Sequence, residues 1–172
     1  MVGEDTTSPN AFYFHEEYEN EAGFKAHTET PHFAQWQSFC DTKPWSNDDG
    51  PQVDFYQGTH AAKKWKIPGY AYCLNVNLYP KPEVRDEFLR VIAANKEGTD
   101  TKEPLALQYV YGESTQSPGT FHFHEQYTGE EDGKEGFDAH AAAPHFQEWE
   151  AFASKDVFQK PPEVSFFKTI HC

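Results

Sequence analysis

The chain has 172 residues, a formal net charge of −14 and many aromatic residues: fifteen Phe, nine Tyr and four Trp. The acidic balance argues against nucleic acid or an anionic membrane surface as a partner, because phosphate groups would be repelled. The sequence holds no apolar run long enough to cross a bilayer. Its three cysteines lack zinc-finger spacing, and so small and odd a number suggests a reducing compartment. We therefore expect a soluble intracellular protein, cytoplasmic by default with an organelle left open.

A block of histidine and aromatic residues occurs twice, at 12–39 and at 121–152. Both copies contain F-x-F-H-E-x-Y, then G-F-x-A-H, then P-H-F-x-x-W-x-x-F. A repeat that preserves polar and apolar positions together indicates a duplicated structural unit. Counting back along the ungapped match places Met1 opposite Val110, so the earlier copy begins inside an expected strand. We therefore expect a partial unit at 1–57, a linker at 58–69 and a complete unit at 70–172. Either the chain is a fragment of a longer protein, which we favour, or something else supplies the missing half of the partial unit.

The expected elements of the earlier copy are few. A strand is expected at 11–18, two short helices at 21–39 and a last strand at 53–57. Thr30 stands where it could cap the second helix, directly before Pro31.

The later copy shows a full set of elements. The stretch 70–79 alternates, with Leu74 and Val76 on one face and Asn75 and Asn77 on the other, which is typical of a strand. A helix follows and is expected to end before Gly98. The remaining elements are expected in the following order: a strand at 105–111 with Leu105, Leu107, Tyr109 and Tyr111 on one side, a strand at 120–127, a short helix from about 134, a second helix at 144–154, and a last strand at 164–170. The order β-α-β-β-α-β is that of a ferredoxin-like unit in the α+β class.

The third strand of the later copy, which ends Glu125-Gln126-Tyr127, and the two motifs that follow resemble the antibiotic biosynthesis monooxygenase (ABM) family. The motifs are F-x-A-H at 137–140 and P-H-F at 144–146. Tyr127 replaces the Trp that ends this strand in many members. The resemblance implies that two units pack as a dimeric α+β barrel, here within one chain as a pseudo-dimer or between chains as a homo-oligomer. It also implies an oxygenase that needs no metal or flavin and oxidises quinol-like or polyphenolic molecules with molecular oxygen.

Three histidines of the later copy are candidates for the site. His140 could act as a general base, or could hydrogen-bond a phenol, or could simply satisfy a structural partner. His145 follows the helix-starting proline, and His124 lies on a strand; both have counterparts in the earlier copy. A metal site formed by His122, His124 and His140 is disfavoured, because no acidic residue completes a recognisable set of ligands.

Of these histidines, His140 and His124 are expected to be catalytic, and His145 is expected to bind the substrate. The remaining candidates would bind or orient it, with Asn75 expected to take part in catalysis. Asn75 and Asn77 present a paired amide face that could hold a carbonyl group or a reduced-oxygen species, although a polar sheet face would look the same. Tyr127, Phe137, Phe146 and Trp149 could wall an aromatic pocket, although core packing is the more ordinary explanation for each. Glu125 is expected to be partly buried and to need a hydrogen-bond partner.

Three functions stay open at this stage. The first is a cofactor-independent monooxygenase with a small aromatic substrate, His140 as base and Asn75 as the orienting group. The second is a relative that binds or degrades haem, for which Asn75, Tyr127 and His140 stand in similar places. The third is a non-catalytic barrel used for assembly or ligand sensing.

Overall fold

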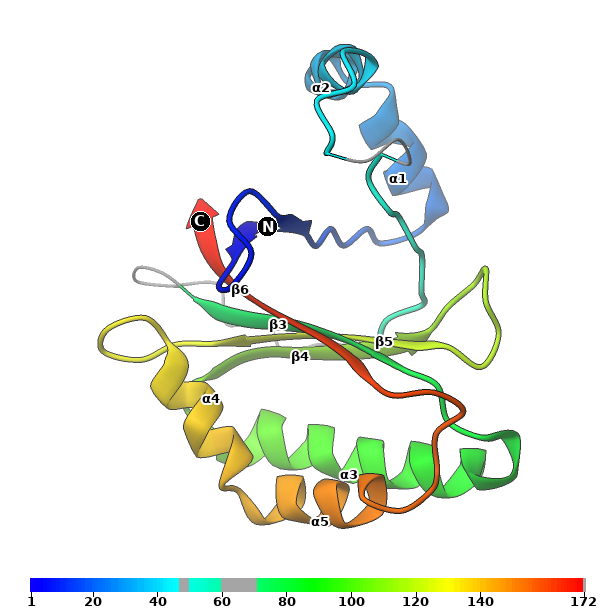
Figure 1. Ribbon diagram of the computed structural model, residues 1–172, viewed down its shortest axis with the longest axis vertical. Coiled ribbons are helices and arrows are strands. Elements are labelled where there is room, and N and C mark those ends of the chain that lie inside the picture. Colours follow the sequence, from blue (N-terminus) through cyan, green and yellow to red (C-terminus); the bar gives the residue numbers. More distant parts are fainter. Residues whose placement is uncertain (47–49, 60–70, 172) are drawn as a thin grey trace. The chain divides into compact units, whose positions relative to one another are not determined.

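A computed structural model of the chain describes residues 1–46, 50–59 and 71–171 (Figure 1). The expected linker at 58–69 lies outside the described residues from residue 60 onward. The chain divides into two compact units. Met1–His15 and Phe55–Cys172 form the first, which we call the sheet unit, and Glu16–Asp54 form the second, which we call the helix-pair unit.

The sheet unit contains one six-stranded antiparallel sheet in the order β2-β1-β6-β3-β5-β4. Its strands are β1 (Val2–Asp5), β2 (Phe12–Phe14), β3 (Tyr72–Leu78), β4 (Ala106–Glu113), β5 (Phe121–Tyr127) and β6 (Glu163–His171). Its helices are η1 (Pro82–Val84), α3 (Arg85–Lys102), α4 (Lys134–Ala141) and α5 (Pro144–Ala153). The later copy alone supplies β3-α3-β4-β5-α4-α5-β6, and its strands lie in the order β6-β3-β5-β4. The predicted ferredoxin-like α+β fold is confirmed.

Helices α3, α4 and α5 all lie on one face of the sheet (Figure 1). We call this the helix-covered face. The core between sheet and helices is rich in aromatic side chains. Its buried members are Leu78, Phe88, Val91, Ile92, Tyr109, Tyr111, Phe121, Phe123, Phe152 and Val157. Large rings give this acidic chain the apolar area that a core requires.

Strand register assigns each side chain to a face. Leu74 of β3 lies opposite Glu125 of β5, and Asn75 lies opposite His124. Since successive side chains alternate, Leu74 and Glu125 share the helix-covered face while Asn75 and His124 share the opposite face. The alternation predicted for 70–79 is confirmed for the described residues of that stretch.

Helix α3 is longer than predicted, because it continues through Gly98 to Lys102. Gly98 serves helix packing instead of helix termination. A Cβ atom at this position would lie 2.5 Å from Nδ1 and 2.7 Å from Cδ2 of the His145 ring. The glycine therefore lets the start of α5 approach α3 closely.

A second prediction, the face assignment of the side chains in strand β4, is wrong in part. The register between β4 and β5 shifts between Ala106 and Gln108, which marks a bulge. Leu107 consequently packs with Cys73 and Phe167 on the opposite face, whereas Tyr109 belongs to the core beneath the helices. Leu107 and Tyr109 had been predicted to share a side, but the extra residue of a bulge breaks simple alternation.

The earlier copy contributes β1 and β2 to the sheet, and β1 pairs with β6 of the later copy. The strand predicted at 11–18 is confined to Phe12–Phe14. No strand forms at 53–57; Tyr56 makes only an isolated bridge to Ser114. Val53 is 65% exposed, so the apolar residues that suggested a strand here are not held against a core.

The helix-pair unit contains α1 (Glu21–Thr28) and α2 (Pro31–Asp41). Asn20 caps α1 by accepting a hydrogen bond from the backbone N–H of Gly23. Thr30 caps α2 in the same way through Phe33, as predicted. Among the described residues, no helix has the length and apolar character needed to span a membrane.

Candidate functional site

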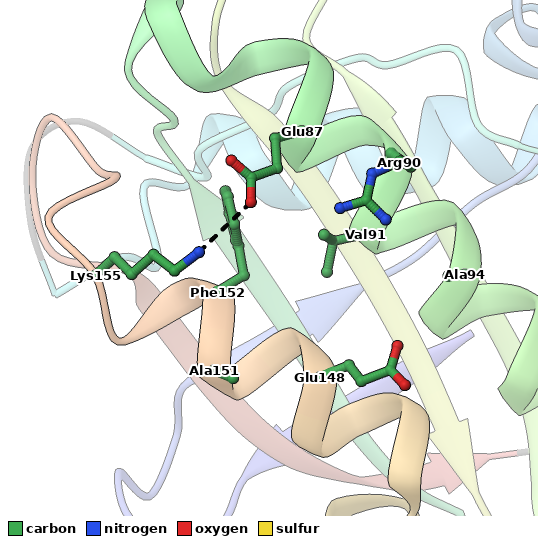
Figure 2. Close-up of a pocket in the computed structure, with 8 residues that line it drawn as sticks. All are labelled: Glu87, Arg90, Val91, Ala94, Glu148, Ala151, Phe152 and Lys155. Carbon is green, nitrogen blue, oxygen red and sulfur yellow. Dashed lines mark hydrogen bonds and ion pairs between the residues drawn. The ribbon is translucent and has the colours of Figure 1, made fainter.

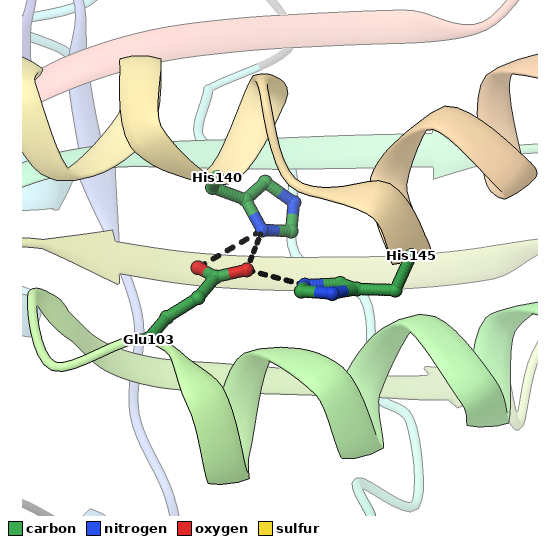
Figure 3. A group of neighbouring side chains, drawn as sticks. All are labelled: Glu103, His140 and His145. Atoms are coloured by element: carbon green, nitrogen blue, oxygen red, sulfur yellow. Dashed lines mark hydrogen bonds and ion pairs between the residues drawn. The ribbon is translucent and has the colours of Figure 1, made fainter.

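Three polar side chains of the later copy meet between α3 and the α4–α5 pair (Figure 3). Glu103 is the residue directly after α3 and has extended backbone angles, which turn it away from the helix axis. His140 lies in the last turn of α4. His145 follows Pro144, the first residue of α5, so the break between the two helices brings both imidazoles toward the same carboxylate.

Glu103 accepts hydrogen bonds from both histidines. His140 Nδ1 lies 2.9 Å from Oε1 and 3.1 Å from Oε2. His145 Nε2 bonds to the same Oε1. Because an ionised carboxylate only accepts, the proton of neutral His140 is on Nδ1 and the lone pair is on Nε2. The Thr99 hydroxyl, which donates to the Asn95 carbonyl, lies 3.4 Å from the same Nδ1.

The Nε2 atom of His140 lies among aromatic rings. The side chain is fully buried, with ring centroids of Phe146 at 4.8 Å and Tyr127 at 5.3 Å. Among the described residues, no group lies within hydrogen-bond distance of Nε2. A buried polar atom without a partner is costly and uncommon, so it calls for a functional explanation.

The carboxylate of Glu103 is held in its charged form. Burial alone would raise the pKa of Glu103, but the hydrogen bonds from His140 and His145 and the electrostatic attraction of these rings outweigh burial and keep the pKa below its ordinary value. The site therefore keeps a negative charge that fixes both imidazole rings.

A second buried carboxylate lies close by on β5. Glu125 accepts a hydrogen bond of 2.6 Å from the Tyr127 hydroxyl, so the hydrogen-bond partner predicted for this buried carboxylate is present. Burial raises the pKa of Glu125, although the nearby His140 opposes this shift. The pKa of Tyr127 is also raised well above its usual value, first by burial and then by Glu125, so Tyr127 remains a hydrogen-bond donor.

The opposite face of the sheet carries a separate polar group. Asn75 Oδ1 accepts a hydrogen bond of 2.8 Å from His124 Nδ1, and Gln126 donates to His124 Nε2 at 2.9 Å. The ring of His15 stacks on His124 with centroids 3.7 Å apart. Burial, followed by the charges of His15 and the N-terminus, lowers the pKa of His124 well below its ordinary value. His124 is therefore neutral and fully engaged in hydrogen bonds.

The predicted site residues accordingly divide between two faces. The helix-covered side holds His140, His145, Tyr127, Phe137 and Trp149. The opposite face holds Asn75, Asn77 and His124. The sheet thus separates His140 from Asn75, and one cavity cannot hold both. The same separation removes the geometric basis for the haem alternative, which requires Asn75, Tyr127 and His140 together.

Individual placements refine the predicted roles. Trp149 packs against Phe88, Phe152 and Phe158, so it belongs to the core. Phe137 contacts Tyr127 with ring centroids 5.9 Å apart and lines the same layer as His140. His122, His124 and His140 do not come together, because the first two lie on the opposite face.

Glu103 was not predicted as a site residue from the sequence. The helix had been expected to end before Gly98, which left Glu103 in an unplaced loop. The earlier copy, which supplied the list of repeated residues, contains no counterpart of α3 and so no counterpart of Glu103. The only feature of the sequence that could have drawn attention to Glu103 was an acidic residue directly after a helix.

Two surface grooves lie elsewhere in the sheet unit. The groove in Figure 2 has a volume of about 250 Å³ and lies between α3 and α5, and Lys155 pairs with Glu87 at 3.5 Å. The other has a volume of about 450 Å³ and is lined by Glu4, Asp5, Thr6, Asp132, Lys168, Thr169 and Ile170. Neither is lined by a residue predicted for the site.

Solved structures match this chain either over nearly its whole length or over a little more than half of it. A proposed monooxygenase of Lactobacillus acidophilus matches with a TM-score of 0.78 and 16% identity over 96% of this chain and 73% of that one. A proposed monooxygenase of Fusobacterium nucleatum matches with a TM-score of 0.80 and 16% identity over 99% of this chain and 74% of that one. A proposed antibiotic biosynthesis monooxygenase of Nitrosomonas europaea matches with a TM-score of 0.51 and 19% identity over 58% of this chain and 99% of that one. At these identities the likeness concerns the fold.

The sequence itself matches a family model. No curated protein matches the chain. The model described as antibiotic biosynthesis monooxygenase matches residues 2–38 and 71–151, one segment in each copy of the repeat. The matched segments cover more than half of the sequence, and the resemblance drawn from the repeated motifs is confirmed: the chain belongs to the antibiotic biosynthesis monooxygenase family.

Proposed function

We propose that the later copy is a cofactor-independent monooxygenase for a quinol-like or polyphenolic molecule, with His140 as the group that accepts the substrate proton. The observation that carries this proposal is the state of His140. Its Nδ1 is bonded to Glu103, and its Nε2 is buried among aromatic rings without a partner among the described residues. A carboxylate–imidazole pair of this kind orients a lone pair for proton abstraction.

Beyond accepting this proton, the protein has a small part in the reaction, because the substrate itself supplies the electrons. Loss of a phenolic proton to Nε2 gives an electron-rich phenolate that can pass electrons to molecular oxygen. Oxidation of an activated CH₂ group to C=O then consumes one O₂ and releases one water, so the substrate supplies all four electrons. The protein has to bind a flat ring, hold the base and exclude water.

The surroundings of His140 suit a flat aromatic substrate. Phe146, Tyr127 and Phe137 present ring faces and edges in one layer. Phe146 lies nearest to the imidazole, with ring centroids 4.8 Å apart. Because His140 is fully buried, some of the surrounding side chains have to move for a substrate to reach Nε2. The Tyr127 hydroxyl is already bonded to Glu125, so it shapes this wall and is not the base.

Oxygen uptake tests the proposal. The protein is given a panel of quinols and anthrone-type phenols, and uptake is compared with that of His140→Ala and Glu103→Gln. We expect His140→Ala to lose about 100-fold or more in rate, as is typical for removal of a general base. Glu103→Gln should lose less, because the base remains but its orientation is weakened.

His122→Ala is the matched control, since it removes an imidazole from the opposite face, where His122 bonds to Asn77. It should leave uptake unchanged. Equal uptake by the wild type and His140→Ala would remove His140 from the reaction. No uptake by the wild type across the panel would favour the non-catalytic alternative.

A further inference from the structure

The two copies of the repeat bring the same pair of histidine nitrogens together. In the earlier copy, His27 Nδ1 lies 3.3 Å from His32 Nε2. In the later copy, His140 Nδ1 and His145 Nε2 converge on one carboxylate oxygen. The rings cross at similar angles, 52° in the earlier pair and 56° in the later pair. Convergence of two imidazole nitrogens is therefore a property of the repeated motif.

The later copy adds a third ligand. Glu103 Oε1, His140 Nδ1 and His145 Nε2 all lie within 4.8 Å of one another. Two imidazoles and one carboxylate suit a transition-metal ion of the Zn²⁺, Fe²⁺ or Co²⁺ class, and three protein ligands leave a position open for water or another small molecule.

Burial and charge favour the same reading. The side chains of Glu103, His140 and His145 are 9%, 0% and 10% exposed. An ion bound here would be largely withdrawn from water, and its ligands are already held by the ends of three helices. The net charge of −14 raises the local concentration of cations around the protein.

We propose that Glu103, His140 and His145 form a binding site for one divalent transition-metal ion, through Oε1, Nδ1 and Nε2. At bond lengths of about 2.0–2.1 Å in a tetrahedral geometry, ligand atoms lie about 3.3 Å apart. Both nitrogens lie closer than this to Glu103 Oε1, so metal binding replaces the two hydrogen bonds and moves each nitrogen away from the oxygen by a small side-chain shift.

This metal site is additional to the proposed oxygenase function, and a bound ion would block that function. A metal ion on Nδ1 leaves the imidazole proton on Nε2. The base proposed above needs its lone pair on Nε2, so the metal-loaded protein should not abstract the substrate proton. Metal and oxygenation would exclude each other at His140, and the ion would act as an inhibitor.

Cobalt titration tests the site without any substrate. The full chain is treated with a chelator, dialysed and titrated with Co²⁺, and visible d–d absorption and calorimetry report geometry and stoichiometry. We expect one Co²⁺ per chain, displaced by Zn²⁺. Glu103→Gln and His145→Ala, checked for folding by circular dichroism, should each weaken binding by about 100-fold or more, because outer-shell changes alone typically cost 10–100-fold.

Two control variants locate the ion. His122→Ala should bind like the wild type, and so should His32→Ala, which breaks only the earlier pair. The proposal is overturned if the wild type binds neither Co²⁺ nor Zn²⁺, if Glu103→Gln and His145→Ala bind as the wild type does, or if His32→Ala alone abolishes binding. Each of these results leaves the oxygen-uptake experiment unaffected, so the two proposals can fail separately.

Discussion

Gly98 offers a sharp test of how α3 and α5 pack, because two effects of opposite sign compete there. In a helix interior, Gly→Ala ordinarily stabilises a protein by about 1 kcal/mol. At Gly98, however, the added Cβ would lie 2.5 Å from His145 Nδ1, well inside van der Waals contact. The clashing atoms belong to a ring that is itself held by Glu103, so it cannot move without loss.

The size of the effect follows from the two ways of relieving the clash. If His145 stays, overpacking costs about 1–3 kcal/mol. If it rotates away, the hydrogen bond to a charged group is lost, which costs about 1.5–3 kcal/mol. After the gain of about 1 kcal/mol from helix propensity, Gly98→Ala should lower the free energy of unfolding by about 1 kcal/mol.

Urea denaturation followed by circular dichroism measures this change. Ala93→Gly, at an exposed position of the same helix, calibrates the propensity and should cost about 1 kcal/mol. In a His145→Ala background the obstacle is gone, and Gly98→Ala should stabilise by about 1 kcal/mol, giving a coupling of about 2 kcal/mol in the double-mutant cycle. Stabilisation by Gly98→Ala alone would refute the close packing of α3 against His145.

Three further predictions concern Glu103, Glu125 and Thr30. Glu103→Gln should lower the free energy of unfolding by about 1.5–3 kcal/mol at pH 7. Because the pKa of Glu103 is lower in the folded state, its carboxylate stabilises the protein above the unfolded-state pKa of about 4.3 and loses this effect in acid. In urea titrations the difference between wild type and variant should therefore shrink as the pH falls below about 4.3. Glu125→Gln should show the opposite pH dependence. Because the pKa of Glu125 is raised in the folded state, the wild type loses stability as the pH rises above about 4.3, and the variant should become more stable relative to it. A stability difference independent of pH would contradict this reasoning. Thr30→Ala removes the cap of α2 and should weaken protection of its amide hydrogens against exchange by about 1 kcal/mol, while the amides of α3 stay unchanged.

Local patterns predicted the elements well where one physical rule dominates. The alternation around Asn75 defined β3, and Pro144 marked the first turn of α5. Prediction was wrong where tertiary contacts override the local rule. Gly98 looked like a helix end but allows close packing, and Leu107 changes face at a bulge.

The candidate site was predicted in part for a similar reason. The repeat pointed to His140 and His145, which do meet. It could not point to Glu103, which has no counterpart in the earlier copy. Asn75 was predicted to share a site with His140, whereas strand pairing with His124 places it on the other side of the sheet.

The pairing of β1 with β6 has a consequence for how the chain acquires its structure. Gly3 pairs with Thr169 and Asp5 with Phe167, so residues more than 160 positions apart share one ladder. Of the two strands that pair with β1 here, the short β2 is made soon after it and β6 much later. Contacts of such high sequence separation slow folding, and an unpaired strand edge invites association with other chains during the delay. Assembly of the central sheet therefore depends on β6, a strand far from β1 in the sequence.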